Sequence, residues 1–205
     1  MTGVFPADVQ VAIVTHNNLA ALPDTLDALA AAGCAPAAIT VIDIACTDGT
    51  AGWLAAQWPA IRVRRLDAND GPNPGRNLGI REATSRFVLL MDADVLLDPG
   101  TVPRLRADMV ADDRIGIGSP VVVHLDRPDV IQYAGVGIHY ICEATNPWLN
   151  RTRQERGPAP ADIGAAAASA LLIDRQKAIA VGLFDERYFM GKDDGDFTHR
   201  MRIGG

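Results

Sequence analysis

Residues 87–94 read FVLLMDAD, five apolar residues followed by two aspartates that one alanine separates. Such an apolar run is typical of a strand buried on both faces, as in a parallel sheet covered by helices. In extended backbone, residues i and i+2 point the same way, so the carboxylates of Asp92 and Asp94 leave this strand together. Paired carboxylates are typical ligands of Mg²⁺ or Mn²⁺ beside substrate phosphates. Simple turn chemistry explains the triplet about as well.

Strand and helix patterns alternate before this run. They predict strands at 9–15, 39–43, 61–66 and 87–91, and helices at 22–32, 48–57 and 73–83. The alternation predicts an α/β domain with a largely parallel sheet, whose strands have their carboxyl ends at one edge. Asp43 closes the second strand at that edge. Its carboxylate is a candidate acceptor for a base or ribose, and a structural cap is an equal alternative.

The pattern changes after the two aspartates. It predicts a helix at 101–112, strands or a hairpin at 121–124 and 130–140, and a polar loop at 146–161. Residues 165–173 could form a helix or a strand, and a strand that ends at Asp174 is favoured. A short helix at 176–181 and a helix that begins near Asp194 follow. That last helix opens on the acidic cluster Asp193, Asp194 and Asp196. Spacing alone favours a capped helix start, because negative charge is stabilising there. The functional alternative is a general base.

Composition excludes some classes of protein. The chain has 205 residues, 48% of them hydrophobic, and a net charge of −6, so no basic surface for nucleic acid is expected. The longest nearly apolar stretch, 163–173, is far shorter than the roughly 20 residues that a membrane helix needs. No signal peptide is visible at the start. We therefore expect no integral membrane segment and a cytoplasmic location, with a peripheral position at the inner face of the membrane as an alternative.

Five blocks together resemble the family-two glycosyltransferases, inverting enzymes of the GT-A fold, and especially their rhamnosyltransferase-like bacterial members. The blocks are 11–18, 41–50, 69–80, 92–94 and 182–197. The sequence departs from the family pattern where Tyr, Asn, Ser and Glu are usual, at His16, Ile44, Cys46 and Asp193 respectively.

The resemblance implies transfer of a sugar, with inversion and with help from Mg²⁺ or Mn²⁺. The donor is expected to be a UDP-, dTDP- or GDP-linked sugar, and the acceptor a saccharide or a lipid-linked molecule, in cell-wall or polysaccharide biosynthesis. The implied nucleotide-side residues are Thr15, His16, Asn17, Asp43, Arg76, Asn77 and Asp92. Asp92 is expected to touch ribose or metal, and Asp94 to ligate the metal. Asp194 is the implied catalytic base, supported by Asp193.

The resemblance also predicts the organisation of the chain. Residues 1–205 form a single catalytic domain, with a donor-binding half at 1–98 and an acceptor-side half at 99–205. Family members usually continue past this point, so a chain truncated at its C-terminus is expected. One alternative is an inactive module that binds nucleotide sugars. Another is a nucleotidyltransferase, but residues 15–19 are neither glycine-rich nor basic, as a triphosphate-binding loop would be.

Overall fold

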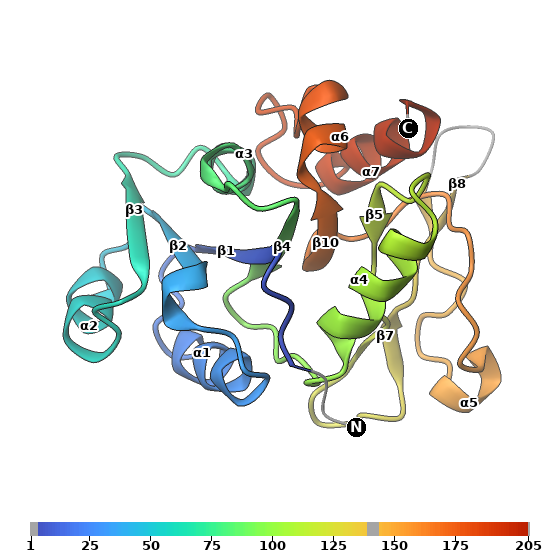
Figure 1. Cartoon of the computed structure of the whole chain (residues 1–205), viewed down its shortest axis with the longest axis horizontal. Helices are drawn as coiled ribbons and strands as arrows, with labels where there is room; N and C mark the ends of the chain where they lie inside the picture. The colour runs from blue at the N-terminus through green and yellow to red at the C-terminus, as the bar shows by residue number, and fades with distance from the viewer. Residues whose placement is uncertain (1–3, 139–143, 205) are drawn as a thin grey trace.

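A six-stranded sheet forms the centre of the molecule in the computed structural model, which describes residues 4–138 and 144–204 (Figure 1). The strands lie in the order β3-β2-β1-β4-β10-β5. Their bounds are β1 Val9–Thr15, β2 Ile39–Ile44, β3 Arg62–Leu66, β4 Phe87–Asp92, β5 Ile117–Gly118 and β10 Ala170–Asp174. The first four strands of this order are parallel, whereas β10 runs antiparallel to both of its neighbours. The expected α/β fold with a mostly parallel sheet is confirmed.

Helices cover both faces of the sheet. One face packs against α1 (Leu22–Ala31), α2 (Thr50–Gln57) and α4 (Thr101–Ala111), and the other against α3 (Pro72–Glu82), α6 (Arg175–Ala180) and α7 (Asp193–Gly204), as Figure 1 shows. Alternate residues of β4 enter the two apolar clusters, so Leu89 faces one core and Leu90 the other, and neither is exposed. This explains why the strand is apolar throughout.

Two glycines let α3 lie close against the sheet. A Cβ atom added at Gly79 would come within 2.7 Å of the Ala12 Cβ atom on β1, and one added at Gly75 would come within 3.1 Å of Ile42. Neither glycine has a positive φ angle, so the reason for glycine here is space and not backbone conformation. The close approach sets the position of Arg76, which lies between the two glycines.

The second half of the chain is less regular than the sequence predicts. The expected hairpin is short, with β6 (Val122–Val123) paired to β7 (Ile131–Tyr133), followed by β8 (Gly137–Ile138) and β9 (Ala144–Thr145). Residues 139 and 140 of the expected strand lie outside the described residues. The predicted loop at 146–161 contains a short helix, α5 (Arg153–Arg156). The strand predicted from residue 165 begins only at Ala170.

The first half agrees with the sequence more closely. Each predicted helix and strand up to residue 112 lies within two residues of its expected bounds. A 3₁₀ turn that was not predicted, η1 (Pro36–Ala38), precedes β2. None of the helices in the described part of the chain is both long and apolar enough to cross a bilayer.

Candidate active site

The parallel register places three polar strand ends side by side. Thr15 of β1 pairs with Asp43 of β2, and Val14 of β1 pairs with Asp92 of β4. The carboxyl ends of these three neighbouring strands therefore form one edge of the sheet, which is where α/β proteins bind ligands. Three of the predicted site residues, Thr15, Asp43 and Asp92, thus come together there from segments far apart in the sequence.

Asp43 is completely buried at this edge, and both of its oxygens have donors. Its Oδ1 atom accepts a hydrogen bond from the Cys46 amide at 2.7 Å, and its Oδ2 atom pairs with Arg65 Nη1 at 2.7 Å. Arg65 also donates to the Cys46 carbonyl at 2.8 Å, and its side chain is 50% exposed. The exposed group at this point of the edge is thus the Arg65 guanidinium, which its hydrogen bonds to the Asp43 carboxylate and the Cys46 carbonyl hold in place.

The loops after β1 and β2 are tied to each other. The Asn17 side-chain oxygen accepts from the Thr47 amide at 2.7 Å, and the Asn17 amide donates to the Cys46 sulfur at 3.2 Å. His16 Nδ1 lies 2.6 Å from the Ile44 carbonyl oxygen, to which it donates. Asn17 and Ala45 have positive φ angles, of 50° and 49°. Backbone of this kind is common at functional sites. The hydrogen bonds between the two loops hold them together, so the loops form one wall at this edge of the sheet.

Thr15 provides a polar group without a partner. Its Oγ1 atom is buried and has no hydrogen-bond partner in the described part of the chain. Buried hydroxyls are rarely left unpaired in native proteins, because the lost hydrogen bond is unfavourable. Because this oxygen is inaccessible from the surface, a ligand at this edge could contact it only after a rearrangement of the neighbouring groups.

The two aspartates that follow β4 differ in exposure. Asp94 is exposed, whereas the Asp92 side chain is 34% exposed and pairs with Arg76 Nη2 at 3.3 Å. Burial raises the pKa of the Asp92 carboxyl to about 6, and the Arg76 guanidinium opposes that rise. The nearby charges of Asp94 and Asp193 add to it. A cation bound at this point would favour the ionised form of Asp92.

The second acidic cluster lies at the start of α7, close to the first. Asp193 is buried and pairs with Arg76 Nη1 at 2.8 Å, so one arginine contacts both clusters. Asp194 is partly exposed, and its Oδ1 atom accepts from the Gly195 amide at 2.7 Å. The Asp194 charge adds to the effect of burial in raising the pKa of Tyr133 on β7. Asp194 therefore lies near Tyr133, within the same predicted acceptor-side half of the chain.

Asn77 has a different set of contacts. Its side chain accepts from the Phe184 amide at 2.9 Å and donates to the Phe184 carbonyl at 2.9 Å and to Glu186 at 2.7 Å. The side chain is buried and holds the segment before α7 against α3. Its expected contact with the donor stays a prediction.

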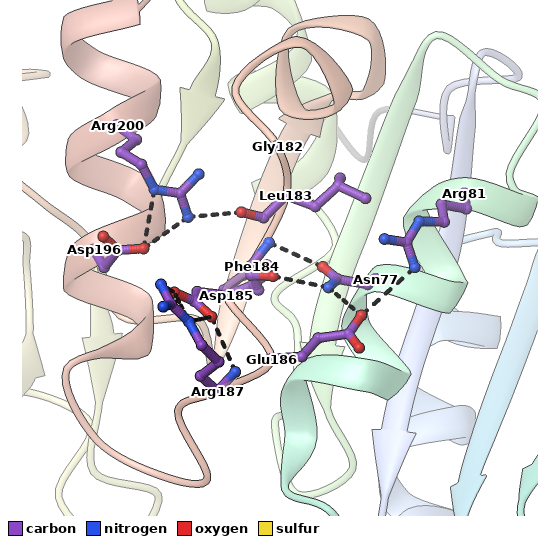
Figure 2. A pocket seen from close by; sticks show the side chains of 10 residues that line it. All are labelled: Asn77, Arg81, Gly182, Leu183, Phe184, Asp185, Glu186, Arg187, Asp196 and Arg200. Carbon is purple, nitrogen blue, oxygen red and sulfur yellow. Dashed lines mark hydrogen bonds and ion pairs between the residues drawn. The ribbon is translucent and has the colours of Figure 1, made fainter.

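A polar cavity of about 610 Å³ lies between α3, residues 182–187 and α7 (Figure 2). Its charged side chains pair with one another: Arg200 with Asp196 at 2.7 Å, Arg187 with Asp185 at 2.6 Å, and Arg81 with Glu186 at 3.5 Å. Asp196 is the one member of the two acidic clusters that lines it, whereas Asp92, Asp94, Asp193 and Asp194 do not. Since these charges are compensated internally, we interpret the cavity as a joint between elements and place the candidate active site at the sheet edge.

The residues present suit a divalent cation that is held jointly with a ligand. No group of three or more His, Cys, Asp or Glu side chains within 4–138 and 144–204 is arranged to hold a metal ion. Mg²⁺ typically takes one or two carboxylates and completes its shell with water and substrate phosphates. Asp92 and Asp94 are such a pair, directly after a rigid buried strand.

Sequence reasoning missed Arg65 as part of this edge. Nothing in the sequence around Arg65 indicates a role at this edge. Its pairing with Asp43 follows only once β3 is placed beside β2 in parallel. The role of Cys46 was also missed. Its thiol donates to the Thr15 carbonyl at 3.5 Å and accepts from Asn17, so it links the two loops, and the departure from the usual serine was the available signal.

Comparisons with known proteins agree with this arrangement. The sheet with its carboxylates at one edge defines a GT-A glycosyltransferase fold. The model of the protein family described as "Glycosyl transferase family 2" matches residues 10–169 of this chain. The chain belongs to glycosyl transferase family 2, whose chemistry is the transfer of a sugar from a nucleotide sugar.

Two curated relatives are similar over much of the chain. An N-acetylglucosaminyl-diphospho-decaprenol L-rhamnosyltransferase of Mycobacterium tuberculosis is 28% identical over 226 aligned residues, which cover 100% of this chain and 72% of the relative. The succinoglycan biosynthesis protein ExoO of Rhizobium meliloti is 27% identical and covers 68% of this chain and 41% of the relative. Both names belong to glycan assembly, in agreement with the expected role in cell-wall or polysaccharide biosynthesis.

Solved structures share the fold at low identity. The mannosyltransferase PcManGT of Pyrobaculum calidifontis, in complex with GDP-Man and Mn²⁺, superposes with a TM-score of 0.66 at 18% identity over 97% of this chain. GalNAc-T7 with UDP, GalNAc and Mn²⁺ gives a TM-score of 0.68 at 17% identity over 94% of this chain. The chain spans 52% and 40% of these two structures.

Proposed function

We propose that this chain transfers a sugar from a nucleoside-diphosphate sugar to an acceptor hydroxyl, with inversion at the anomeric carbon and with the help of Mg²⁺ or Mn²⁺. The observation that carries the proposal is the meeting of two acidic clusters at one sheet edge. Asp92 ends β4 and Asp94 lies two residues further on, Asp193 and Asp194 open α7, and Arg76 contacts both clusters. Family membership supports sugar transfer over a binding module or a nucleotidyltransferase.

On the donor side, we assign the nucleotide to the wall built by the loops after β1 and β2. The fixed and half-exposed guanidinium of Arg65 is the group there that can recognise a ligand, and Thr15 lies beneath this edge with its hydroxyl buried. His16 and Asn17 shape the wall, and Asp43 holds Arg65 in place. In this proposal the donor sugar is linked to UDP, dTDP or GDP, and the structural neighbours in complex with GDP-Man and UDP support two of these three.

The metal would be held by Asp94, with Asp92 as a second ligand or as the contact to ribose. When bound, a divalent cation would supply positive charge to the diphosphate leaving group. Arg76 adds one fixed positive charge beside Asp92. The neighbours with Mn²⁺ in their crystals support a divalent ion without choosing between Mg²⁺ and Mn²⁺.

Asp194 is proposed as the general base. Its carboxylate is partly exposed at the first turn of α7, where it can reach an acceptor hydroxyl and take its proton during attack. Attack opposite to the diphosphate inverts the anomeric configuration. Asp193 is buried against Arg76 and supports the first turn rather than meeting the acceptor.

The acceptor is proposed to approach from the half of the chain after residue 98. A cavity of about 380 Å³ in this half is lined by Trp148, Arg156 and Asp162 among others. Aromatic rings commonly stack on sugars, which favours a saccharide there, and a simple loop anchor is the alternative interpretation of Trp148. The relative named for a diphospho-decaprenol supports a lipid-linked acceptor, and with it a peripheral position at the inner face of the membrane.

Turnover tests the proposal. Donor sugars linked to UDP, dTDP or GDP are incubated with Mn²⁺ and a panel of saccharide and lipid-linked acceptors, and the anomeric configuration of the product is determined by NMR. We expect an inverted product, and a loss of about 10²-fold or more in kcat for Asp194→Asn with nucleotide binding retained. A retained configuration, or full activity in Asp194→Asn, would contradict the assigned mechanism.

A further inference from the structure

One buried arginine joins the two acidic clusters. The Arg76 side chain is 8% exposed, and its two terminal nitrogens contact different elements: Nη1 lies 2.8 Å from Asp193 on α7, and Nη2 lies 3.3 Å from Asp92 at the end of β4. Nη1 also lies 3.3 Å from the Asn73 side-chain oxygen, and the ring of Phe184 packs 5.4 Å from the guanidinium carbon. A charge buried this far needs a paired carboxylate, because the energy of desolvation is otherwise uncompensated.

The two contacts are unequal. The bond to Asp193 is short and joins two buried groups, whereas the bond to Asp92 is longer and its carboxylate is 34% exposed. Asp92 is therefore the partner that can turn toward solvent or a ligand more easily. If either partner withdraws, the guanidinium depends more strongly on the other.

We propose that Arg76 is a positioning residue that couples the donor end of β4 to the start of α7. The proposal rests on the function assigned above and adds a link between its two halves. When Asp92 turns toward the donor and its cation, Arg76 keeps only its ion pair with Asp193. That pair then holds the first turn of α7 in place, and with it Asp194. In the opposite direction, loss of Asp193 leaves Arg76 to Asp92, where it competes with the cation.

A simpler account is available and makes a different prediction. In a purely Coulombic account, any negative charge near the site attracts the cation, so removal of Asp193 weakens cation binding whether or not Arg76 is present. In the coupled account, the effect of Asp193 passes through Arg76 and disappears when the arginine is replaced. A double-mutant cycle separates these two accounts.

The cycle compares wild type, Asp193→Asn, Arg76→Met and the double variant by calorimetric titration of Mn²⁺ with UDP, dTDP and GDP in turn. We expect Asp193→Asn to weaken binding of the Mn²⁺–nucleotide pair by about fivefold or more, the lower end of couplings between sites. In the Arg76→Met background, the same substitution should change the affinity by less than about twofold. An equal loss in both backgrounds, or none in wild type, overturns the coupling.

Two further variants control for charge and for folding. Asp196→Asn removes a carboxylate from the same helix that pairs with Arg200 and not with Arg76, so it should leave the affinity unchanged. Arg76→Met leaves Asp193 buried without its cation and is expected to be less stable, so Arg76→Lys is titrated in parallel. A lysine is a compact charge without the guanidinium fork, so it cannot hold both carboxylates, and the effect of Asp193→Asn should shrink in its presence.

Hydrogen exchange gives a readout that does not depend on turnover. The amides of residues 193–197 should exchange more slowly when Mn²⁺ and the nucleotide bind to wild type, but not when they bind to Arg76→Lys. If both proteins respond alike, the coupling is wrong while the donor site stands. If wild type binds none of the Mn²⁺–nucleotide pairs, the proposed function fails, and the coupling falls with it.

Discussion

The packing of α3 against the sheet gives a sharp stability prediction for Gly79→Ala, with Gly52→Ala as its matched control. Both glycines lie within helices. Gly79 is interior to α3, where alanine gains about 0.8–1.0 kcal/mol of helix propensity, and Gly52 is in the first turn of α2, where the gain is at most this large. They differ in surroundings. A Cβ atom at residue 79 would lie 2.7 Å from the Ala12 Cβ atom, whereas a Cβ atom at residue 52 would meet no atom within 4 Å.

The magnitude follows from this contrast. Ala12 belongs to a central strand and has a short side chain, so the overlap can be relieved only by moving α3 or β1. Such overpacking costs about 1–3 kcal/mol, which offsets or exceeds the gain in propensity. We expect Gly79→Ala to be neutral or up to about 2 kcal/mol less stable than wild type, and Gly52→Ala to be more stable by up to about 1 kcal/mol. Since the propensity gain at residue 79 is at least as large as that at residue 52, the difference in stability between the variants, about 1–3 kcal/mol, is a lower limit on the cost of the overlap.

Urea unfolding, followed by far-UV circular dichroism at one pH and temperature, measures both free energies of unfolding. A displaced α3 should also move Arg76 away from Asp92 or Asp193, so Gly79→Ala should weaken binding of nucleotide with Mn²⁺, while Gly52→Ala should not. Equal stabilisation of both variants would show that α3 does not pack as closely on the sheet as described.

Three other predictions concern single side chains. Asn77→Ala should lower the free energy of unfolding in urea by about 1–3 kcal/mol, because it leaves the Phe184 backbone groups buried and unpaired. A loss of nucleotide affinity in the folded variant would instead support the predicted donor contact of Asn77. In urea unfolding, Arg65→Ala should destabilise the protein by at least about 1 kcal/mol more than Arg64→Ala. The reason is that Asp43, the partner of Arg65, is fully buried, whereas Glu82, the partner of Arg64, is partly exposed. Equal losses would argue against a fixed Asp43–Arg65 pair. Burial raises the pKa of the Cys34 thiol to about 12, so at pH 8 only about one molecule in 10⁴ carries the reactive thiolate. Iodoacetamide at pH 8 should therefore label Cys34 only after denaturation, as mass spectrometry of peptides can show, and rapid labelling of the native protein would contradict the burial.

The regular half of the fold could be predicted from the sequence because its signals are local. Apolar runs and helix stops mark the elements from residue 9 to residue 92, and each lies within two residues of its expected place. Later signals depend on distant partners. The antiparallel direction of β10 is set by its neighbours β4 and β5, and nothing within 170–174 indicates it.

Short elements were missed for a related reason. Helix α5 has only four residues. Its capping box between Thr152 and Glu155 was not recognised, because the surrounding stretch is rich in arginine and proline and was interpreted as a loop. Strand β5 has two residues and exists only through its pairing with β10. Elements this short have no periodicity to read.

For the candidate site, the sequence indicated the carboxylates but not their connections. The positions of Asp92, Asp94 and Asp194 follow from strand and helix ends, which are local features. The bridging role of Arg76 is different, because it depends on α3 and α7 meeting across 117 residues of chain. Likewise, the burial of Asp43 and the exposure of Arg65 follow from the pairing of β2 with β3.

Calorimetric titration of UDP, dTDP and GDP, each with and without Mn²⁺, tests the central claim most directly. It is made on wild type, on Asp94→Ala, and on Asp126→Ala, which removes a carboxylate whose side chain is 79% exposed. We predict that one diphosphate binds wild type and Asp126→Ala only when Mn²⁺ is present, and that Asp94→Ala loses this binding. No binding to folded wild-type protein, or binding to Asp94→Ala that equals wild type, would contradict a metal-assisted donor site at the end of β4.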